Sequence, residues 1–295
     1  ALLFGDGSYD NLNTSDGNKI PTYQSAASLD NIQSYVTDDF FGWLNDNEGG
    51  NDLSARLDIG IGRFPCKNTD EADVLVDKVE TYLTNLESNN WKARIAFVAD
   101  DDNSNEHLIN AENLAQKMEN MHPEMNYKRI YLEAYQYDGS SSSTTYPGAR
   151  TDFADAINNG SLIINYVGHG NSGGLTADGL FRQSDITSWT NKKRLTFFIT
   201  AACNFAPFDK TDASNSAGEE ALMYDNGGFI ALFSSTRTVY SNSNYQINNA
   251  LYDYLLEKNS DGRQYNLGEA IMQAKNKVGG MINSLKYVLL GDPAI

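Results

Sequence analysis

The strongest constraint on the fold is an alternation between short apolar runs and longer segments with helical periodicity. The short runs are rich in β-branched or aromatic residues and are apolar along almost their whole length, which is typical of strands covered on both faces. Strands that alternate with helices form largely parallel sheets, so the sequence predicts an α/β fold with a largely parallel central sheet. The predicted strands are Leu2–Phe4, Leu57–Ile61, Ile95–Ala99, Leu162–Val167, Leu195–Thr200, Phe229–Phe233 and Tyr287–Leu290.

The clearest predicted helix covers Thr69–Leu86. Apolar residues recur there every three or four positions, and Asn68 with Glu71 resembles a capping box at its start. Further helices are predicted at Glu106–Asn120, from about Thr151 to Asn159, and at Ser216–Tyr224, Tyr245–Glu257 and Leu267–Val278.

The 295 residues are enough for one large domain or two packed lobes. We place a smaller N-terminal α/β subdomain at 1–90 and a larger subdomain at 91–295, because a polar turn follows the first long helix. The chain begins at Ala1 without an initiator Met or a signal-peptide pattern. We therefore expect an excised or processed fragment.

The charge of the chain excludes several classes of partner. The formal net charge is −17 and the sequence pI is about 4.4. Such a surface repels phosphate backbones and anionic bilayers, which argues against nucleic-acid binding. No apolar run approaches the roughly 20 residues that span a bilayer. The many Gly, Asn and Ser residues favour an exported protein.

Of the three histidines, His169 has the most suggestive setting. His107 begins a predicted helix, and His122 precedes Pro123 in a loop. His169 follows the predicted strand Leu162–Val167 and is flanked by Gly168 and Gly170. Glycines allow close approach of the backbone, and the carboxyl edge of an open α/β sheet is where sites are built.

Cys203 lies 34 residues further on, just after the predicted strand Leu195–Thr200. Consecutive parallel strands joined by a crossover are usually neighbours, so we expect the imidazole of His169 and the thiol of Cys203 within a few ångströms. A thiol beside an imidazolium becomes a thiolate and hence a nucleophile. The sequence therefore predicts a cysteine nucleophile with a histidine general base.

Two alternatives compete with that interpretation. Cys66 and Cys203, the chain's two cysteines, could form a disulfide in an oxidising compartment. Alternatively, Cys203 is a small buried apolar residue and His169 a hydrogen-bonded turn residue. The strand-end setting of both residues favours the reactive site.

The motifs around these residues resemble the gingipain family of cysteine peptidases, peptidase family C25, which has a caspase-like fold. The resemblance covers almost the whole chain in the family's order and implies a three-layer sandwich, with 91–295 as the catalytic subdomain. It also implies that the N-terminal subdomain, 1–90, is truncated at its start. It rests on Tyr166–Gly170, Ala201–Asn204, Ile59–Pro65, Gly218–Met223 and Leu290–Ala294.

The resemblance also implies roles for individual residues. His169 is the general base and acid, Cys203 forms the thioester, and the backbone N–H groups of Gly170 and Cys203 form the oxyanion hole. Tyr240 matches an aromatic wall of the substrate pocket, and Arg237 could clamp substrate. Their alternatives are a packing residue and a surface residue.

A carboxylate orients the histidine in this family, and the nearest match is Asp101, with Asp100 and Asp102 as rivals. The family's arginine-specific member has Glu there, so this chain departs from the pattern. The same run does not fit an EF-hand, because Asn105 and Ala111 occupy the positions of the required Gly and Glu. No cofactor is expected for the reaction, a structural calcium ion is compatible with the family, and a solvated acidic loop is the alternative.

Within the family, the closest resemblance is to the sortases of type IX secretion, on Gly5–Asp10, Thr37–Gly42, Val98–Asp102, Asn204–Asp209 and Ser235–Tyr240. It implies removal of C-terminal sorting domains from exported proteins, with water or a surface glycolipid amine as acceptor. It also implies an outer-membrane or cell-surface location in a Gram-negative bacterium, beside other secretion-system proteins. The alternatives are a soluble secreted gingipain-like endopeptidase and a non-catalytic caspase-fold binding protein. In the family's arginine-specific member, an acidic residue at the base of the S1 pocket recognises the guanidinium of the substrate. We find no counterpart of that residue around Asn105–Glu112, which argues against trypsin-like specificity.

Overall fold

The computed structural model describes residues 1–295 except residues 11, 13–18, 28–29, 50–53, 86–89, 141–145 and 212–213. Within that part, the central sheet has the strand order β1-β4-β13-β12-β11-β7-β5-β6. Neighbouring strands are parallel except for β12 and β13. The strands are β1 (Leu2–Phe4), β4 (Gly62–Phe64), β5 (Arg94–Ala99), β6 (Asn126–Tyr131), β7 (Ile163–Val167), β11 (Thr196–Ala201), β12 (Phe229–Ser235) and β13 (Tyr287–Gly291).

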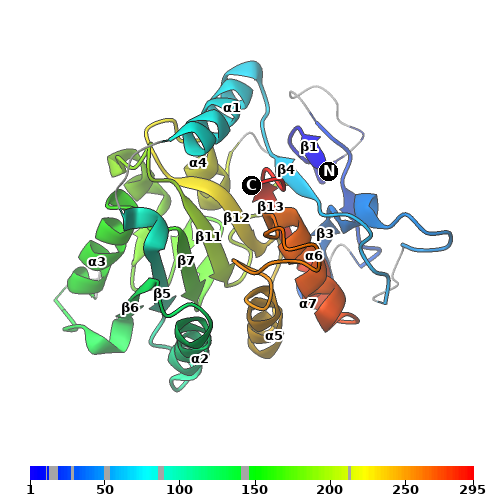
Figure 1. Cartoon of the computed structure of the whole chain (residues 1–295). Helices are drawn as coiled ribbons and strands as arrows, with labels where there is room; N and C mark the ends of the chain where they lie inside the picture. The colour runs from blue at the N-terminus through cyan, green and yellow to red at the C-terminus, as the bar shows by residue number, and fades with distance from the viewer. Residues whose placement is uncertain are drawn as a thin grey trace.

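Helices cover both faces of this sheet (Figure 1). One buried cluster joins the sheet to α1 (Thr69–Thr84), α3 (Pro147–Asn158) and α4 (Ala217–Met223). A second joins the opposite face to α2 (Glu106–Met121), α5 (Ser241–Leu251) and α6 (Leu267–Val278). The fold is therefore an α/β sandwich of three layers with a largely parallel sheet, which confirms the predicted fold class.

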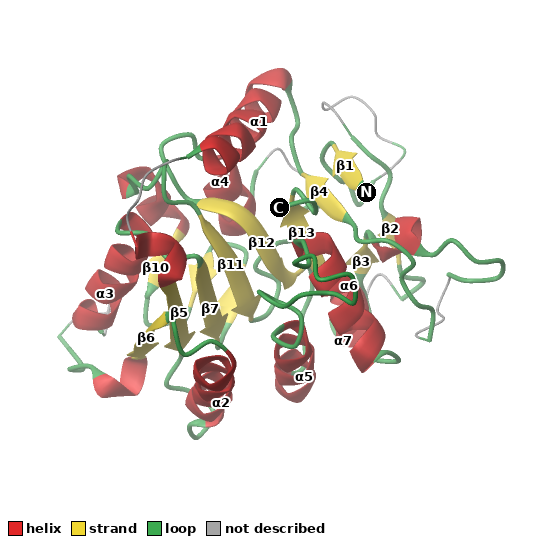
Figure 2. Cartoon of the chain, viewed as in Figure 1, coloured by secondary structure: helices red, strands yellow, loops and turns green. Residues whose placement is uncertain are grey.

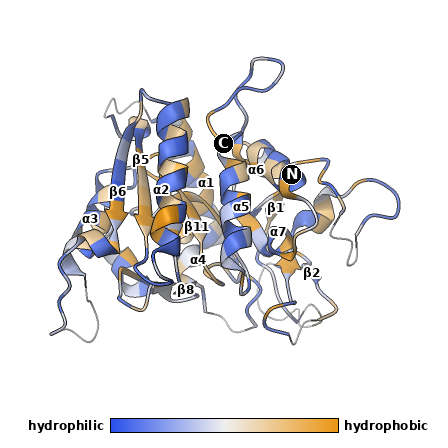
Figure 3. Cartoon of the chain, turned by 90° about the horizontal axis from the view of Figure 1, so that it is seen from below, coloured by the Kyte–Doolittle hydropathy of each residue, from blue (hydrophilic) through white to orange (hydrophobic). Residues whose placement is uncertain are grey.

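The buried strands explain why apolar runs located the sheet. Every residue of β7, β11, β12 and β13 is buried. The helices bury one side and expose the other, so α2 carries both hydrophilic and hydrophobic residues along its length in Figure 3. The predicted strands at Leu2–Phe4, Ile95–Ala99, Leu162–Val167, Leu195–Thr200, Phe229–Phe233 and Tyr287–Leu290 agree with observed strands to within two residues at each end.

The predicted strand Leu57–Ile61 is wrong, because the strand in this region is β4, which starts at Gly62. The backbone N–H of Leu57 donates to Oδ1 of Asn276 at 2.8 Å, and its carbonyl accepts from Nδ2 of the same residue at 2.8 Å. These groups are satisfied by a side chain of α6 and not by a neighbouring strand, so the apolar run packs without joining the sheet.

Helix bounds differ from the prediction most at α5, which covers Ser241–Leu251 and not Tyr245–Glu257. After Leu251 the chain continues in tighter turns, as in the bond from Tyr254 N–H to the Leu251 carbonyl at 3.0 Å. A short helix, α7 (Ile282–Lys286), precedes β13 and was not predicted.

The division at residue 90 stays a prediction. Strands β1 and β4, from the first part, extend the sheet beyond β13, with Arg63 in register with Leu290. Residues 86–89, next to the predicted boundary, lie outside the described residues. Two small antiparallel sheets complete the described strands: β2 (Tyr23–Gln24) with β3 (Val36–Thr37), and β8 (Gly170–Asn171) with β9 (Gly174–Leu175) and β10 (Phe181–Arg182). Among the described helices, none has the length and apolar character needed to cross a membrane.

Candidate active site

The two predicted reactive residues follow neighbouring strands in matching register. Strands β7 and β11 are parallel partners, and Val167 pairs with Ala201. His169 and Cys203 each stand two residues beyond that pair. Figure 2 shows β5, β7 and β11 side by side, pointing the same way. The predicted strand adjacency is confirmed, and both residues leave the same edge of the sheet.

The turn that carries His169 lies directly against the segment that precedes Cys203. The N–H of Gly168 donates to the carbonyl of Ala201 at 3.2 Å. A Cβ placed on Gly170 would lie only 3.1 Å from the Cβ of Ala202. The absence of a side chain at Gly170 therefore lets this turn pack closely against Ala202, the residue before Cys203.

Asp100 anchors the backbone of His169 and is the carboxylate bonded to this segment. Its Oδ2 accepts the His169 N–H at 3.0 Å, and its Oδ1 accepts the Asp101 N–H at 3.1 Å. The Tyr166 hydroxyl donates to the His169 carbonyl at 2.6 Å, which holds the other side of the residue. Burial raises the pKa of Asp100 to about 6, while the bond from the His169 N–H opposes that rise.

Asp101, predicted to orient the imidazole, is bonded to a tyrosine hydroxyl. Its Oδ2 accepts from the Tyr146 hydroxyl at 2.6 Å, and its buried Oδ1 has no hydrogen-bond partner among the described residues. Its rival Asp102 is exposed. The orienting role of Asp101 thus stays a prediction, and the contact with the His169 segment belongs to Asp100 through the backbone.

The sequence analysis missed His107, whose ring touches that of His169. The ring centroids are 5.2 Å apart with perpendicular planes. His107 is 3% exposed, and Asn103 Nδ2 lies 3.0 Å from its Nε2. Burial and then the charge of His169 lower the pKa of His107, so the neutral form is favoured. Its position in the first turn of α2 gave no signal of this contact.

Cys203 is half-buried, Cys66 is buried, and neither forms a disulfide. The disulfide alternative is therefore absent from this structure. The Sγ of Cys203 lies 3.8 Å from the Val239 carbonyl oxygen. The next residue, Asn204, donates its N–H to the Arg237 carbonyl at 3.2 Å. The loop after β11 is thus fastened to the segment that follows β12.

The predicted substrate-binding residues lie on that same segment. Tyr240 precedes α5 and is 48% exposed. The guanidinium of Arg237 forms two hydrogen bonds with the carboxylate of Asp209, at 2.9 and 2.5 Å. Arg237 therefore already has an anionic partner, and substrate binding by both residues stays a prediction. The oxyanion-hole roles of Gly170 and Cys203 also stay predictions.

Three carboxylates gather beside the His169 anchor. Oxygens of Asp100, Asp101 and Asp178 lie within 4.8 Å of one another. Hard oxygen ligands of this kind suit calcium, and the unpartnered Oδ1 of Asp101 is available to an ion.

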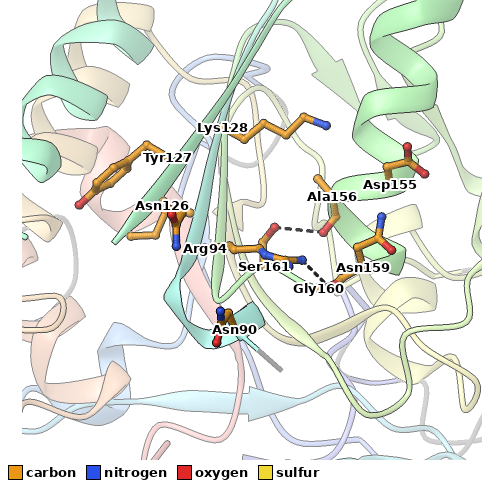
Figure 4. A pocket seen from close by; sticks show the side chains of 11 residues that line it. Asn90, Arg94, Asn126, Tyr127, Lys128, Asp155, Ala156, Asn159, Gly160 and Ser161 are labelled. Atoms are coloured by element: carbon orange, nitrogen blue, oxygen red, sulfur yellow. Dashed lines mark hydrogen bonds between the residues drawn. The ribbon is translucent and has the colours of Figure 1, made fainter. Parts of the chain in front are cut away.

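A pocket of about 500 Å³ lies at the opposite edge of the sheet (Figure 4). Its walls include Arg94 and Asn126, the first residues of β5 and β6. Arg94 donates to the Asn159 carbonyl at 3.2 Å, and Ser161 donates to the Ala156 carbonyl at 3.0 Å. Because His169 and Cys203 follow the carboxyl ends of strands, this pocket is separate from the candidate active site.

A three-layer α/β sandwich with a free thiol and an imidazole after adjacent parallel strands has the architecture of the caspase-like cysteine peptidases. The family description "Peptidase family C25" matches residues 1–295. The chain therefore belongs to peptidase family C25, which confirms the resemblance seen in the sequence. A comparison with curated proteins found no match.

Solved structures share the fold at low identity. The Arg-specific cysteine proteinase gingipain R (RGPB) is 17% identical with a TM-score of 0.72, and the match covers 99% of this chain and 62% of that chain. The separase of the Saccharomyces cerevisiae separase–securin complex is 13% identical with a TM-score of 0.52, over 81% of this chain and 14% of that chain. The chain thus spans less than two thirds of either protein.

Dimeric latent PorU from Porphyromonas gingivalis is 20% identical with a TM-score of 0.43. That match covers 100% of this chain and 23% of that chain. At this TM-score the likeness carries no argument about the present chain.

Proposed function

We propose that this chain is the catalytic part of a cysteine endopeptidase in which Cys203 attacks the substrate carbonyl and His169 transfers the proton. The supporting observation is the register: each residue stands two positions beyond the Val167–Ala201 pair of neighbouring parallel strands. Membership of a cysteine-peptidase family supports the same assignment.

The reaction follows from the chemistry of the two groups. The Cys203 thiolate forms an S–C bond with the carbonyl carbon, and the peptide amine leaves with the proton that His169 supplies. Water or another amine then attacks the thioester, loses its proton to His169 and releases the thiol. The N–H groups of Gly170 and Cys203 are proposed to stabilise the oxyanion, and Tyr240 and Arg237 to contact substrate.

The test is cleavage of denatured casein followed by mass spectrometry, with Cys203→Ala and His169→Ala as variants. We expect both variants to lose cleavage, with circular dichroism showing that they fold. Cleavage by the Cys203→Ala protein would overturn the nucleophile assignment. The Cys66→Ala variant is the matched control, because Cys66 is the chain's other cysteine and is fully buried.

We further propose a sortase-like function in type IX secretion, in which the thioester passes to an amine of a surface glycolipid. The proposal rests on the sequence segments that resemble those sortases. Two of them meet beside the Cys203 loop, because Asp209 pairs with Arg237 and the Arg237 carbonyl accepts the Asn204 N–H. In a third segment, Asp38 forms hydrogen bonds with the buried Arg63 at 2.8 and 2.7 Å. The proposal places the protein at the outer membrane or cell surface beside other secretion-system proteins.

Acceptor choice can be measured directly. Exported cargo with its C-terminal sorting domain is incubated with the protein and a biotinylated amine. Products that carry the amine at the new carboxyl end support transpeptidation. Free carboxyl ends alone, at millimolar amine, would favour the soluble endopeptidase.

A structural calcium ion is also proposed, with Asp100, Asp101 and Asp178 as its ligands. Its positive charge would offset the repulsion among the three carboxylates next to the His169 anchor. Calcium, but not magnesium, should raise the thermal unfolding midpoint, and EGTA should reverse the effect. An unchanged midpoint would contradict the proposal.

A further inference from the structure

Lys286 is a buried cation that the reaction described so far does not use. It ends α7 and is 0% exposed. Its Nζ donates to the Thr238 carbonyl at 2.6 Å and to the Ile32 carbonyl, and it lies 5.9 Å from the ring centre of Tyr240. Within the described part of the chain, no carboxylate forms an ion pair with it. Burying an ammonium whose hydrogen bonds go to neutral carbonyls costs folding free energy, so we looked for a function that this lysine serves.

The segment that binds Lys286 also holds the loop of Cys203. Thr238 accepts from Lys286, and the neighbouring carbonyls of Arg237 and Val239 contact Asn204 N–H and the Cys203 sulfur. The ammonium of Lys286 and the loop that carries Cys203 are therefore both bonded to the three consecutive residues 237–239. Burial lowers the pKa of Lys286 to about 8, and the charge of Cys203 is the main interaction that opposes this.

The other ionisable groups nearby are either paired already, negatively charged or neutral, so none of them is a better partner for a thiolate than Lys286. Arg237 is paired with Asp209 through two hydrogen bonds. Asp30 is exposed, and its Oδ1 accepts two backbone N–H groups. Tyr287 also interacts with the charge of Cys203. Burial raises the pKa of the Tyr287 hydroxyl, so this side chain stays neutral. Among the described residues, Lys286 is the cation of this group that forms no ion pair with a carboxylate, and the charge of Asp30 acts on it less than that of Cys203.

We propose that Lys286 is a positioning residue that stabilises the Cys203 thiolate from the side of α7, in addition to the imidazolium of His169. This inference rests on the proposed function, since it assumes that Cys203 is the nucleophile. An ammonium near a thiolate favours the charged form of the sulfur, and burial weakens the screening by water. The ammonium keeps its protons throughout the reaction.

The first test is the pH dependence of Cys203 alkylation by iodoacetamide, in which the thiolate forms an S–C bond and iodide leaves. Lys286→Gln removes the charge but keeps a donor for the Thr238 carbonyl. We expect its alkylation profile to move to higher pH by about half a unit to one unit, and the rate at pH 6.5 to fall about three- to tenfold. Lys286→Arg should restore most of the rate.

Lys78→Met is the matched control. Lys78 is also a buried lysine that donates to carbonyls, including those of Leu222 at 2.6 Å and Gly227 at 2.8 Å. It belongs to α1 and has no interaction with Cys203, so its removal should leave the alkylation profile in place. An unchanged profile in Lys286→Gln, or an equal shift in Lys78→Met, would overturn the proposal.

A second measurement covers the case in which Lys286→Gln does not fold. Coupling between two charges is reciprocal, so loss of the thiolate should lower the pH at which Lys286 titrates. The ¹³Cε signal of Lys286 can be followed by NMR in the unmodified protein and in Cys203→Ser. Identical titration curves would contradict the proposal.

These results separate the inference from the proposed function. If His169→Ala abolishes alkylation at pH 6.5 but Lys286→Gln has no effect, only the inference fails. If Lys286→Gln shifts the profile but Cys203→Ala still cleaves casein, the thiolate partner stands and the proposed function fails.

Discussion

The imidazole of His107 meets the imidazole of His169 edge to face, with ring centroids 5.2 Å apart. The two residues come from different elements, the first turn of α2 and the turn after β7. Because burial and the charge of His169 lower the pKa of His107, the neutral ring supports its neighbour without adding a second positive charge.

We predict that His107→Ala lowers kcat about ten- to hundredfold, because a cavity beside His169 lets its ring leave the productive position. His107→Phe keeps a ring at the contact and should retain most of kcat. The measurement is kcat and KM on a cleaved peptide. His122→Ala is the control, since His122 lies at the far end of α2 beside Glu124 and Glu257. Equal kcat values for His107→Ala and the unmodified protein would contradict the prediction.

The second prediction separates the two neighbouring aspartates. Asp100→Ala removes the acceptor of the His169 N–H, so we expect kcat/KM to fall about ten- to hundredfold. Asp101→Asn keeps an acceptor for the Tyr146 hydroxyl, so its kcat/KM should stay within about threefold of that of the unmodified protein. Kinetics at one pH on both variants decide the matter. A loss in Asp101→Asn as large as that in Asp100→Ala would support Asp101 as the orienting carboxylate.

The sequence could predict that the two candidate residues lie at one edge of the sheet, because both follow strands that are apolar throughout. Strands such as β7 and β11 are recognisable from composition alone, and the crossover rule correctly predicts that they are neighbours. The same method missed β6, an edge strand whose first four residues alternate between exposed and partly buried. It also missed α7, since five residues are too few for a periodic pattern.

Contacts that join distant parts of the chain through single side chains left no sequence signal. Asp100 and His169 are 69 positions apart, and their bond joins a side chain to a backbone N–H. The run of three aspartates made Asp101 look equivalent to Asp100. Only the register of β5 beside β7, in which Ala99 pairs with Val167, decides which carboxylate reaches the turn.

The third prediction concerns stability and pH. Burial, then the charge of Glu219, raises the pKa of Asp6 to about 7. The folded state therefore keeps a proton that the unfolded chain releases near pH 4, and this contribution to stability is lost as the pH rises from about 4 to 7. Asp6→Asn should be more stable than the unmodified protein at pH 8 by about 1–3 kcal/mol.

Urea unfolding at several pH values measures this effect. Asp10→Asn is the control, because Asp10 is an exposed aspartate on the same loop. The expected result is a flatter pH dependence for Asp6→Asn and an unchanged one for Asp10→Asn. A parallel loss of stability with pH in all three proteins would show that Asp6 is not responsible.

The fourth prediction tests what Arg237 does. Arg237→Ala leaves the carboxylate of Asp209, whose side chain is 3% exposed, without its guanidinium. We expect a loss of about 2–4 kcal/mol in the free energy of unfolding, at the lower end of the range for broken buried pairs because the Arg237 side chain is 20% exposed. Arg237→Ala/Asp209→Ala should recover part of that loss. A fully stable Arg237→Ala protein with a raised KM would instead support direct substrate binding.

The last prediction uses the two glycines that flank His169. A Cβ on Gly168 would overlap the Tyr166 hydroxyl and lie 2.5 Å from the Cβ of Asp100. Both neighbours are buried and bonded to His169, so neither can move without shifting that residue. Gly168→Ala should therefore lower kcat about a hundredfold or more. On Gly170 the closest contact is 3.1 Å, to the Cβ of Ala202, which small shifts can relieve. Gly170→Ala should therefore lower kcat about tenfold or less. A loss of kcat equal to that of Gly168→Ala would mean that the space at the two positions does not govern where His169 lies.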